Sequence, residues 1–255
     1  MVDAATPLLE ATGIRCCYES VEVLHGIDLL IEQGSVTAVL GPNGAGKSTL
    51  LSVLAGLNHP SAGQVLFDGT PVRAGAGHTL VHAGLCLIPE GKGIFPNLTV
   101  QENLWMMTHR GTSRRQVEDR AFGRFPQLAS RRKQAAGTLS GGEQQMLALA
   151  RAVSTEPKLL MLDELSMGLA PIIVEDLYGA VGTLARDGVT VVVVEQFAQF
   201  ALKVAQQAVV MTGGRVVHSG PADDVATHLA ELYLGGQAEN GNAPHSAASG
   251  GPAEG

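Results

Sequence analysis

Three short segments of this 255-residue chain carry residues that can bind phosphate, hold a divalent cation or activate water. The first is GPNGAGKST at 41–49, which follows the apolar run VTAVL and precedes the helical pattern STLLSVLAGL. Its glycines let backbone N–H groups wrap around phosphate oxygens, Lys47 can reach the β- and γ-phosphates, and Ser48 can offer a hydroxyl to Mg²⁺. The nucleotide-binding residues predicted from this segment are Gly41, Pro42, Asn43, Gly44, Ala45, Gly46, Lys47, Ser48 and Thr49.

The second segment is LLMLDE at 159–164, a hydrophobic strand pattern that ends in two adjacent carboxylates. Asp163 is predicted to hold the Mg²⁺ shell, as acidic residues do in nucleotide hydrolases with such a phosphate loop. Glu164 is next along the strand, so its side chain points differently and can orient or deprotonate the attacking water. Together with Lys47, these carboxylates predict ATP hydrolysis, with ATP and Mg²⁺ as cofactors.

The third segment is LSGGEQQ, a Ser-Gly-Gly turn that leads into a helical pattern. Backbone N–H groups at such a helix start attract anions, so a second phosphate-binding turn is predicted at Ser140, Gly141, Gly142 and Glu143. This turn cannot serve the phosphates of its own subunit if it lies on a separate helical subdomain. The economical solution is a head-to-tail dimer, in which each turn covers the ATP held by the partner's phosphate loop.

The elements that must position these segments alternate between strand and helix, which predicts an α/β fold. Strand patterns occur at VTAVL, QVLFDG, GLCLIPE, KLLMLDE, VTVVVVE and QAVVMTGGRVVHSG, the last as a hairpin. From about 97 to 157 the patterns are helical or loop-like, which predicts a helical subdomain inserted into a single domain over 1–235. The Gly/Ala-rich remainder, 236–255, has too few large apolar residues to fold and is predicted to be a disordered tail.

The amino-acid composition limits the classes of partner and the cellular compartment that can be expected. A formal net charge of −7 gives no reason to expect a nucleic-acid partner. The three cysteines lack metal spacing and suit a reduced cytosol, and neither a secretory signal nor a membrane-spanning apolar run is recognisable. The basic run SRRKQ at 130–134 is interpreted as a solvated helix end.

Together, the three segments resemble the ATP-binding cassette (ABC) family over residues 8–234. The resemblance implies a P-loop NTPase core with a parallel-rich sheet, an N-terminal antiparallel β region and the inserted helical subdomain. It also implies that Tyr18 stacks on adenine, with ordinary packing as the alternative, and that SMGLAP at 166–171 signals across the dimer.

Three positions depart from the common family pattern. Glu90 replaces a Gln that senses the γ-phosphate and Mg²⁺, and is predicted to join Ser48 and Asp163 as a metal ligand. Gln196 replaces a His and is predicted to act in catalysis by donating a hydrogen bond, because an amide cannot act as a cation. Leu165 replaces the proline that normally follows the glutamate, and restoring that proline is expected to be tolerated.

The phrases PEG…FPNLTVQENL, LSGGEQQMLALARA, GLAP and VEQ resemble the ATPase subunits of branched-chain amino-acid importers. This implies a second ATPase subunit, identical or different, transmembrane permease subunits and, indirectly, a solute-binding protein. It places the chain peripherally at the cytoplasmic face of the membrane. Phe95 is expected to anchor a permease helix, unless it packs within its own subdomain. The solute stays open. Two rival functions are disfavoured: PEG…FPNLTV and VEQ argue against a cassette ATPase of iron–sulfur assembly, and LSGGEQQ argues against a small-molecule P-loop kinase.

Overall fold

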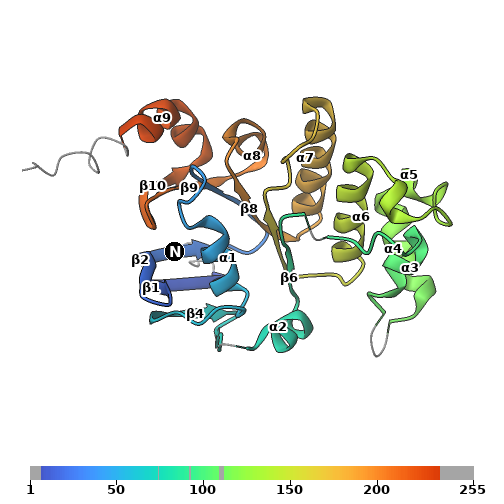
Figure 1. Cartoon of the computed structure of the whole chain (residues 1–255), viewed down its shortest axis with the longest axis horizontal. Helices are drawn as coiled ribbons and strands as arrows, with labels where there is room; N and C mark the ends of the chain where they lie inside the picture. The colour runs from blue at the N-terminus through green and yellow to red at the C-terminus, as the bar shows by residue number, and fades with distance from the viewer. Residues whose placement is uncertain (1–6, 74, 92, 109–111, 236–255) are drawn as a thin grey trace, which may run out of the picture.

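A six-stranded sheet forms the centre of the molecule (Figure 1). The computed structural model describes residues 7–73, 75–91, 93–108 and 112–235, so the predicted disordered tail lies outside the described residues. The sheet order is β10-β9-β3-β8-β7-β6. Its strands are β3 (Val36–Leu40), β6 (Leu85–Ile88), β7 (Leu159–Asp163), β8 (Thr190–Glu195), β9 (Gln207–Thr212) and β10 (Arg215–Pro221).

All neighbouring strands of this sheet run parallel except β9 and β10, which form the predicted hairpin. Every residue of β3 and β8 is buried, as expected for parallel strands covered on both faces. The register pairs Leu40 with Glu195 and Asp163 with Val194. The carboxyl ends of β3, β7 and β8 therefore meet at one edge, where the phosphate loop, the acidic pair and Gln196 emerge.

A second, antiparallel sheet has the order β2-β1-β4-β5, which confirms the antiparallel N-terminal region. The segment QVLFDG lies in this sheet rather than in the parallel one. Its strands are β1 (Leu9–Tyr18), β2 (Val21–Ile31), β4 (Ala62–Phe67) and β5 (Thr70–Pro71).

Two hydrophobic clusters lie on the two faces of the central sheet. The cluster that contains Val192 and Val194 joins one face to α1 and to the antiparallel sheet. The cluster that contains Val191 and Val193 joins the other face to α6, α7 and α8. Alternation along one strand thus assigns successive valines to different layers. The helices outside the region between β6 and β7 are α1 (Lys47–Leu54), α2 (Gly77–Ala83), α7 (Pro171–Arg186), α8 (Ala198–Val204) and α9 (Ala222–Gly235).

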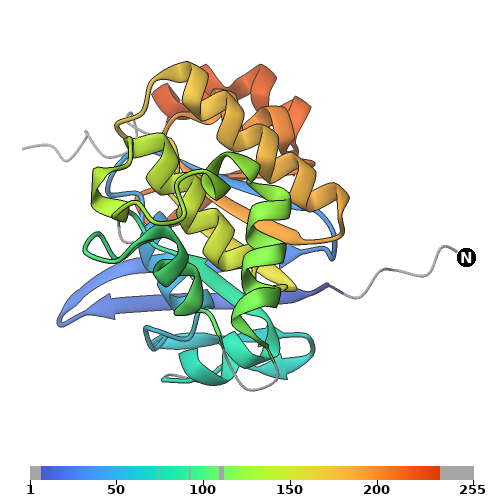
Figure 2. The same ribbon diagram turned by 90° about the vertical axis from the view of Figure 1, so that its right-hand side faces the viewer.

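The helices between β6 and β7 gather at one end of the molecule, at the right of Figure 1 and toward the viewer in Figure 2. The described residues between β6 and β7 form helices, turns and a single isolated bridge, between Thr99 and Ala135. The predicted boundaries of a separate subdomain, 97–157, stay a prediction. The elements are α3 (Val100–Trp105), α4 (Arg114–Arg124), α5 (Pro126–Ala129), η1 (Ala136–Thr138) and α6 (Gly141–Val153).

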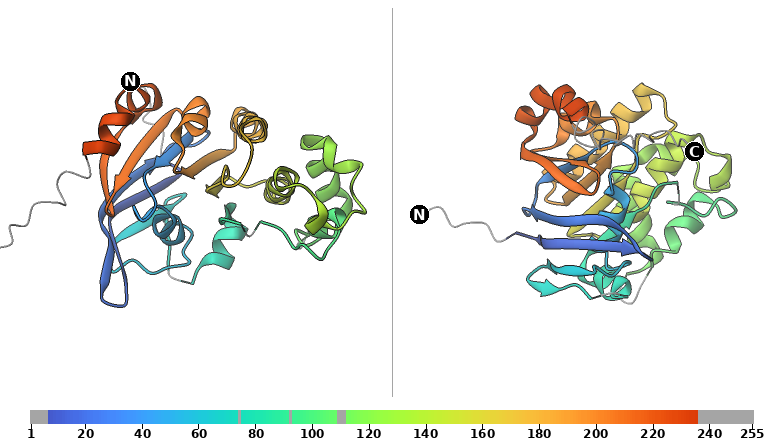
Figure 3. Two further views of the ribbon diagram at one scale, coloured as in Figure 1. Left: turned by 45° about the horizontal axis from the view of Figure 1, so that its top comes forward. Right: turned by 60° about the vertical axis from the view of Figure 1, so that its left-hand side comes forward.

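Both views in Figure 3 show the long α6 and α7 lying near each other beside the central sheet. Within the described ranges, no helix combines the length and the apolar character needed to cross a membrane.

Candidate functional site

The phosphate loop connects the end of β3 to the start of α1. Gly46 caps α1 in the left-handed conformation, with φ at 95°. This conformation favours glycine, and a Cβ atom added there would lie 2.9 Å from Leu24 Cδ2, so the end of that side chain would have to shift. The loop thus presents backbone N–H groups at a helix start, which suits an anion.

Lys47 is the first residue of α1, and its side chain is only 4% exposed. Its Nζ donates hydrogen bonds to the carbonyl oxygens of Gly41, at 2.9 Å, and Pro42, at 3.2 Å. It also lies 3.1 Å from Glu164 Oε1. A buried ammonium needs such partners because isolated charges are costly to remove from water. The predicted phosphate-binding lysine and the predicted catalytic carboxylate are thus in direct contact.

Ser48 and Asp163 also meet, with the Ser48 hydroxyl donating to Asp163 Oδ1 at 3.2 Å. Burial raises the pKa of the Asp163 carboxyl, and the charges of Glu164 and Glu90 raise it further, while the Ser48 hydrogen bond opposes the shift. A bound cation would relieve this accumulation of negative charge. A hydroxyl beside carboxylates is an all-oxygen donor set, which fits Mg²⁺.

A cavity of about 410 Å³ opens over the phosphate loop and contains both Glu90 and Glu164. Ser140, Gly141, Gly142 and Glu143 are absent from its lining, as are Tyr18 and Gln196. The structure therefore brings the first two sequence segments together and leaves the third apart within one subunit. The lining residues are Val23, Asn43, Gly44, Gly46, Lys47, Ser48, Thr49, Glu90, Glu164 and Met167.

Glu164 adopts a left-handed backbone conformation, with φ at 50°. This conformation is uncommon for a residue with a side chain and persists only where the surroundings impose it. The Glu164 N–H donates to the Val194 carbonyl at 3.0 Å, and the Gln196 N–H lies 3.4 Å from Glu164 Oε2. The end of β8 therefore holds both the backbone and the carboxylate of Glu164.

The Ser-Gly-Gly turn caps α6 within its own subunit. The Ser140 hydroxyl accepts from the Glu143 N–H, while Glu143 Oε2 accepts from the Ser140 N–H at 2.9 Å and from its hydroxyl at 2.8 Å. Glu143 Oε1 also pairs with Arg131 Nε at 2.7 Å. The Ser140 N–H lowers the pKa of Glu143, so this carboxylate is held ionised at the helix start.

The same turn packs closely against its neighbours. A Cβ atom added to Gly142 would lie 2.2 Å from Ile173 Cγ2, at the start of α7. Gly142 is therefore required by packing as well as by its predicted contact with phosphate. Arg131 and Arg132 pair with Glu143 and Glu118, so the basic run 130–134 is more than a solvated helix end.

Tyr18, at the end of β1, is 49% exposed, and its hydroxyl accepts from Asn58 Nδ2 at 2.7 Å. Part of the Tyr18 side chain is thus accessible to a ligand, and its stacking on adenine stays a prediction. Gln196 is half-buried and directly follows β8. Its predicted contact with the γ-phosphate is likewise a prediction.

Two buried polar residues near the site were not recognised in the sequence. Glu195 is fully buried at the end of β8. In the sequence it is only the last residue of the strand pattern VVVVE, which gives no sign of its burial. Asn103 is fully buried in α3 and fastens the loop around Phe95. It accepts from the Phe95 N–H at 2.7 Å and donates to the carbonyls of Phe95, Leu98 and Thr99. Side chains with such partners are visible only once the fold is known.

Comparison with known proteins gives one consistent result. A family model described as "ABC transporter" matches residues 24–166. The chain is 40% identical to the high-affinity branched-chain amino acid transport ATP-binding protein BraG of Pseudomonas aeruginosa, over 90% of this chain and 100% of BraG. It is 37% identical to the probable branched-chain amino acid transport ATP-binding protein LivF of Archaeoglobus fulgidus, over 87% and 95%. An ATP-binding cassette solved in its ADP conformation superposes with a TM-score of 0.78 at 25% identity, over 90% and 99%.

Gln196 offers a test of the hydrogen-bond assignment. We expect Gln196→His to retain substantial ATPase activity, because a ring N–H can replace the amide donor. Gln196→Leu should lose about ten- to a hundredfold in kcat, which corresponds to one hydrogen bond to a charged group. Steady-state ATP hydrolysis measures both variants, and Phe197→Ala, at the exposed neighbouring side chain, is the control. Wild-type turnover in Gln196→Leu would show that this side chain only packs.

Leu165 offers a test of the missing proline. No hydrogen bond of the described residues uses the Leu165 N–H, but the side chain is 2% exposed within the core. We therefore expect Leu165→Pro to lower stability, since lost packing outweighs the gain of about 0.4–1 kcal/mol from restricting the unfolded chain. This reverses the expectation from sequence. Thermal unfolding measures the melting temperatures of Leu165→Pro and Leu165→Ala. Leu165→Ala loses only the side-chain packing, so the difference between the two variants gives the backbone effect of proline. A Leu165→Pro protein as stable as the wild type would restore the expectation from sequence.

Proposed function

The chain belongs to the ABC transporter family, and we propose that it is the ATP-hydrolysing subunit that energises an importer of branched-chain or related amino acids. The observation that carries the catalytic part is the convergence of Lys47, Ser48 and Glu164 at one cavity, with Asp163 bonded to Ser48. The names of BraG and LivF, both ATP-binding proteins of branched-chain amino acid transport, support the transported class.

Each of the predicted site residues has a separate task in this proposal. The loop N–H groups and Lys47 bind the β- and γ-phosphates, and the ammonium exchanges loop carbonyls for phosphate oxygens. Ser48, Asp163 and Glu90 would hold Mg²⁺, which supplies neutralisation of the phosphate charge. Glu164 orients the attacking water and accepts its proton. Gln196 donates a hydrogen bond to the γ-phosphate.

The position of the Ser-Gly-Gly turn supports a dimer. Ser140 and Gly141 are exposed at the start of α6 and do not line the cavity of their own subunit. We infer that this turn covers ATP bound to a second subunit, identical or different, so that ATP joins the two and hydrolysis releases them. The turn is preorganised for this task by its own capping box.

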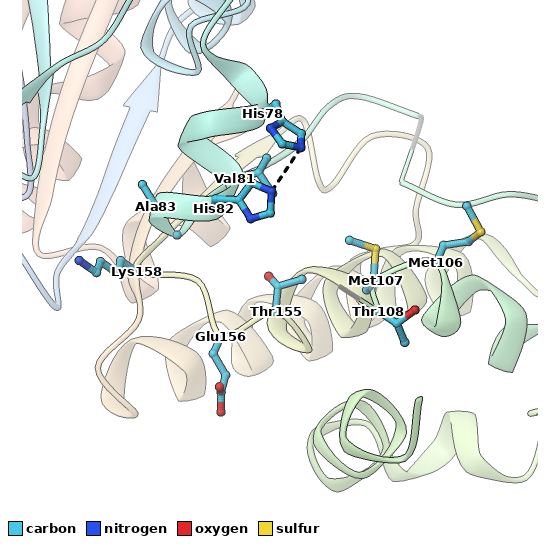
Figure 4. Close-up of a pocket in the computed structure, with 11 residues that line it drawn as sticks. His78, Val81, His82, Ala83, Met106, Met107, Thr108, Thr155, Glu156 and Lys158 are labelled. Atoms are coloured by element: carbon cyan, nitrogen blue, oxygen red, sulfur yellow. Dashed lines mark hydrogen bonds between the residues drawn. The ribbon is translucent and has the colours of Figure 1, made fainter. Parts of the chain in front are cut away.

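A second cavity, of about 400 Å³, supports docking of a permease helix (Figure 4). Val81 on α2 and Met106 after α3 line it, and both side chains are 56% exposed. His78 and His82 contact each other on the same rim, with their Nε2 atoms 3.2 Å apart. An exposed apolar surface inside a concave site is suited to burying a partner's side chains. In this proposal the permease holds the subunit peripherally at the cytoplasmic face of the membrane.

Phe95, on the chain that leads into α3, is linked to this cavity through Arg151, which also contacts Sδ of the lining residue Met107 at 3.5 Å. The Phe95 ring is 44% exposed and lies 4.8 Å from the Arg151 guanidinium. The backbone around it is fastened by Asn103. Because the loop begins at Glu90, which lines the ATP cavity, a change at the nucleotide can reach this surface through five residues of chain.

Glu164→Gln tests the catalytic and dimer assignments together. We expect turnover to be abolished while ATP binding persists, because Lys47 and the loop remain. Light scattering should then show a dimer with MgATP and a monomer without it. Ser140→Arg added to Glu164→Gln should remove the dimer, since the longer cation crowds the partner's phosphates. A Glu164→Gln protein that stays monomeric at saturating ATP contradicts the two-segment site, and retained turnover contradicts the role of Glu164.

Val81→Glu and Phe95→Ala test the docking surface. Both should weaken co-purification with the permease subunits and lower solute uptake per ATP hydrolysed, because buried anchors of this kind cost about 2 kcal/mol or more on truncation. The isolated variants should fold and bind ATP normally. The control is Leu30→Glu, at a side chain 61% exposed on β2. Normal assembly and uptake in both variants, or loss of assembly in the control, contradicts the docking surface. Unfolding of Phe95→Ala would show instead that this ring packs within its own subunit.

A further inference from the structure

Glu195 is a fully buried carboxylate that no step of the proposed mechanism uses. It is the last residue of β8 and lies in register with Leu40, the residue before the phosphate loop. Carboxylates are rarely buried completely unless hydrogen bonds or a cation compensate the loss of water. The groups that compensate this buried carboxylate therefore indicate its role.

Three uncharged groups donate hydrogen bonds to the Glu195 carboxylate. The Ser166 N–H donates to Oε1 at 2.9 Å, and the Ser166 hydroxyl donates to Oε2 at 2.7 Å. The Tyr178 hydroxyl donates to Oε1 from α7 at 2.6 Å. Burial raises the pKa of Glu195, and the charge of Glu164 adds to the shift, while these hydrogen bonds oppose it. Two of the three bonds therefore go to a single loop residue, Ser166.

Ser166 is two residues after Glu164, and Gln196 directly follows Glu195. The Gln196 N–H lies 3.4 Å from Glu164 Oε2. A closed ring results: Glu164 leads along the chain to Ser166, Ser166 is bonded to Glu195, and Glu195 leads to Gln196, which returns to Glu164. The two bonds between Ser166 and Glu195 are the side-chain link that closes this ring.

We propose that Glu195 is a positioning residue, which fastens the turn after Glu164 to the end of β8 and so keeps the Glu164 carboxylate and Gln196 in one fixed arrangement. This inference rests on the catalytic role proposed for Glu164. The left-handed backbone of Glu164, with φ at 50°, is the strained conformation that such a fastening maintains. Ser166 also begins the loop SMGLAP, so a movement of that loop would reach Glu164 through the same link.

The geometry separates a positional role from an electrostatic one. In Glu195→Gln the amide oxygen can accept at the place of Oε1, and the amide NH₂ can donate to the Ser166 hydroxyl, which rotates to accept. The ring then stays closed without the charge. Glu195→Leu fills similar space but leaves the Ser166 N–H and the Tyr178 hydroxyl without acceptors, so the ring opens.

The test compares kcat, ATP affinity and melting temperature in the full-length chain. We expect Glu195→Gln to keep kcat within about threefold of the wild type. Glu195→Leu should lose about ten- to a hundredfold in kcat, with ATP affinity changed by less than about threefold. The control is Tyr178→Phe, which removes one donor and leaves both Ser166 bonds. It should lower the melting temperature without lowering kcat by more than about threefold.

Three results would overturn the proposal. Equal losses of kcat in Glu195→Gln and Glu195→Leu would assign the effect to the charge of Glu195. Wild-type kcat in Glu195→Leu would show that Glu195 does not position the site. Losses of kcat that follow the melting temperature in all variants would show that Glu195 contributes only to core packing. If Glu195→Leu does not fold, Ser166→Ala replaces it, with an expected loss of about three- to tenfold in kcat at unchanged ATP affinity. Retained turnover in Glu164→Gln would instead contradict the proposed function, so the two failures are distinguishable.

Discussion

The arrangement of the site depends on one buried cation, the ammonium of Lys47. It lies at the base of the phosphate loop with almost no access to water, and two loop carbonyls and Glu164 compensate it. Charges in such surroundings are stable only with close partners. The loop after β3 and the strand end of β7 must therefore converge, and the central sheet, with β8 between β3 and β7, provides that convergence. Phosphate can replace these partners without leaving the ammonium unpaired.

The Ser-Gly-Gly turn at the start of α6 meets one requirement within its own subunit and, in the proposed dimer, a second. Within the subunit, Ser140 and Glu143 cap the helix, and Gly142 allows α7 to approach closely. These contacts would be needed even without a nucleotide. In the proposed dimer, the same exposed helix start at Gly141 would face the partner's phosphate, because the amino end of a helix favours an anion.

Buried polar side chains fasten the loops that surround the nucleotide cavity. Asn103 holds the loop around Phe95, and Glu195 holds the turn around Ser166. Hydrogen bonds of this kind contribute modest net stability, but a partner removed inside the core leaves an unsatisfied group at a high cost. Such residues therefore define the loop conformation more than they define the overall stability.

The fold class and two of the chemical segments could be predicted before the structure, because strand periodicity, the glycine spacing of 41–49 and the acidic pair at 163–164 are local patterns. The resemblance to the ABC family rested on these two segments together with LSGGEQQ, and the comparisons confirmed the family. Three contacts became visible only in the folded chain: Lys47 with Glu164, Leu165 with the core, and Glu195 with Ser166. Lys47 and Glu164 are 117 positions apart and Ser166 and Glu195 are 29 apart, and no local pattern encodes a partner at such a distance. The burial of Leu165 likewise depends on which elements cover it.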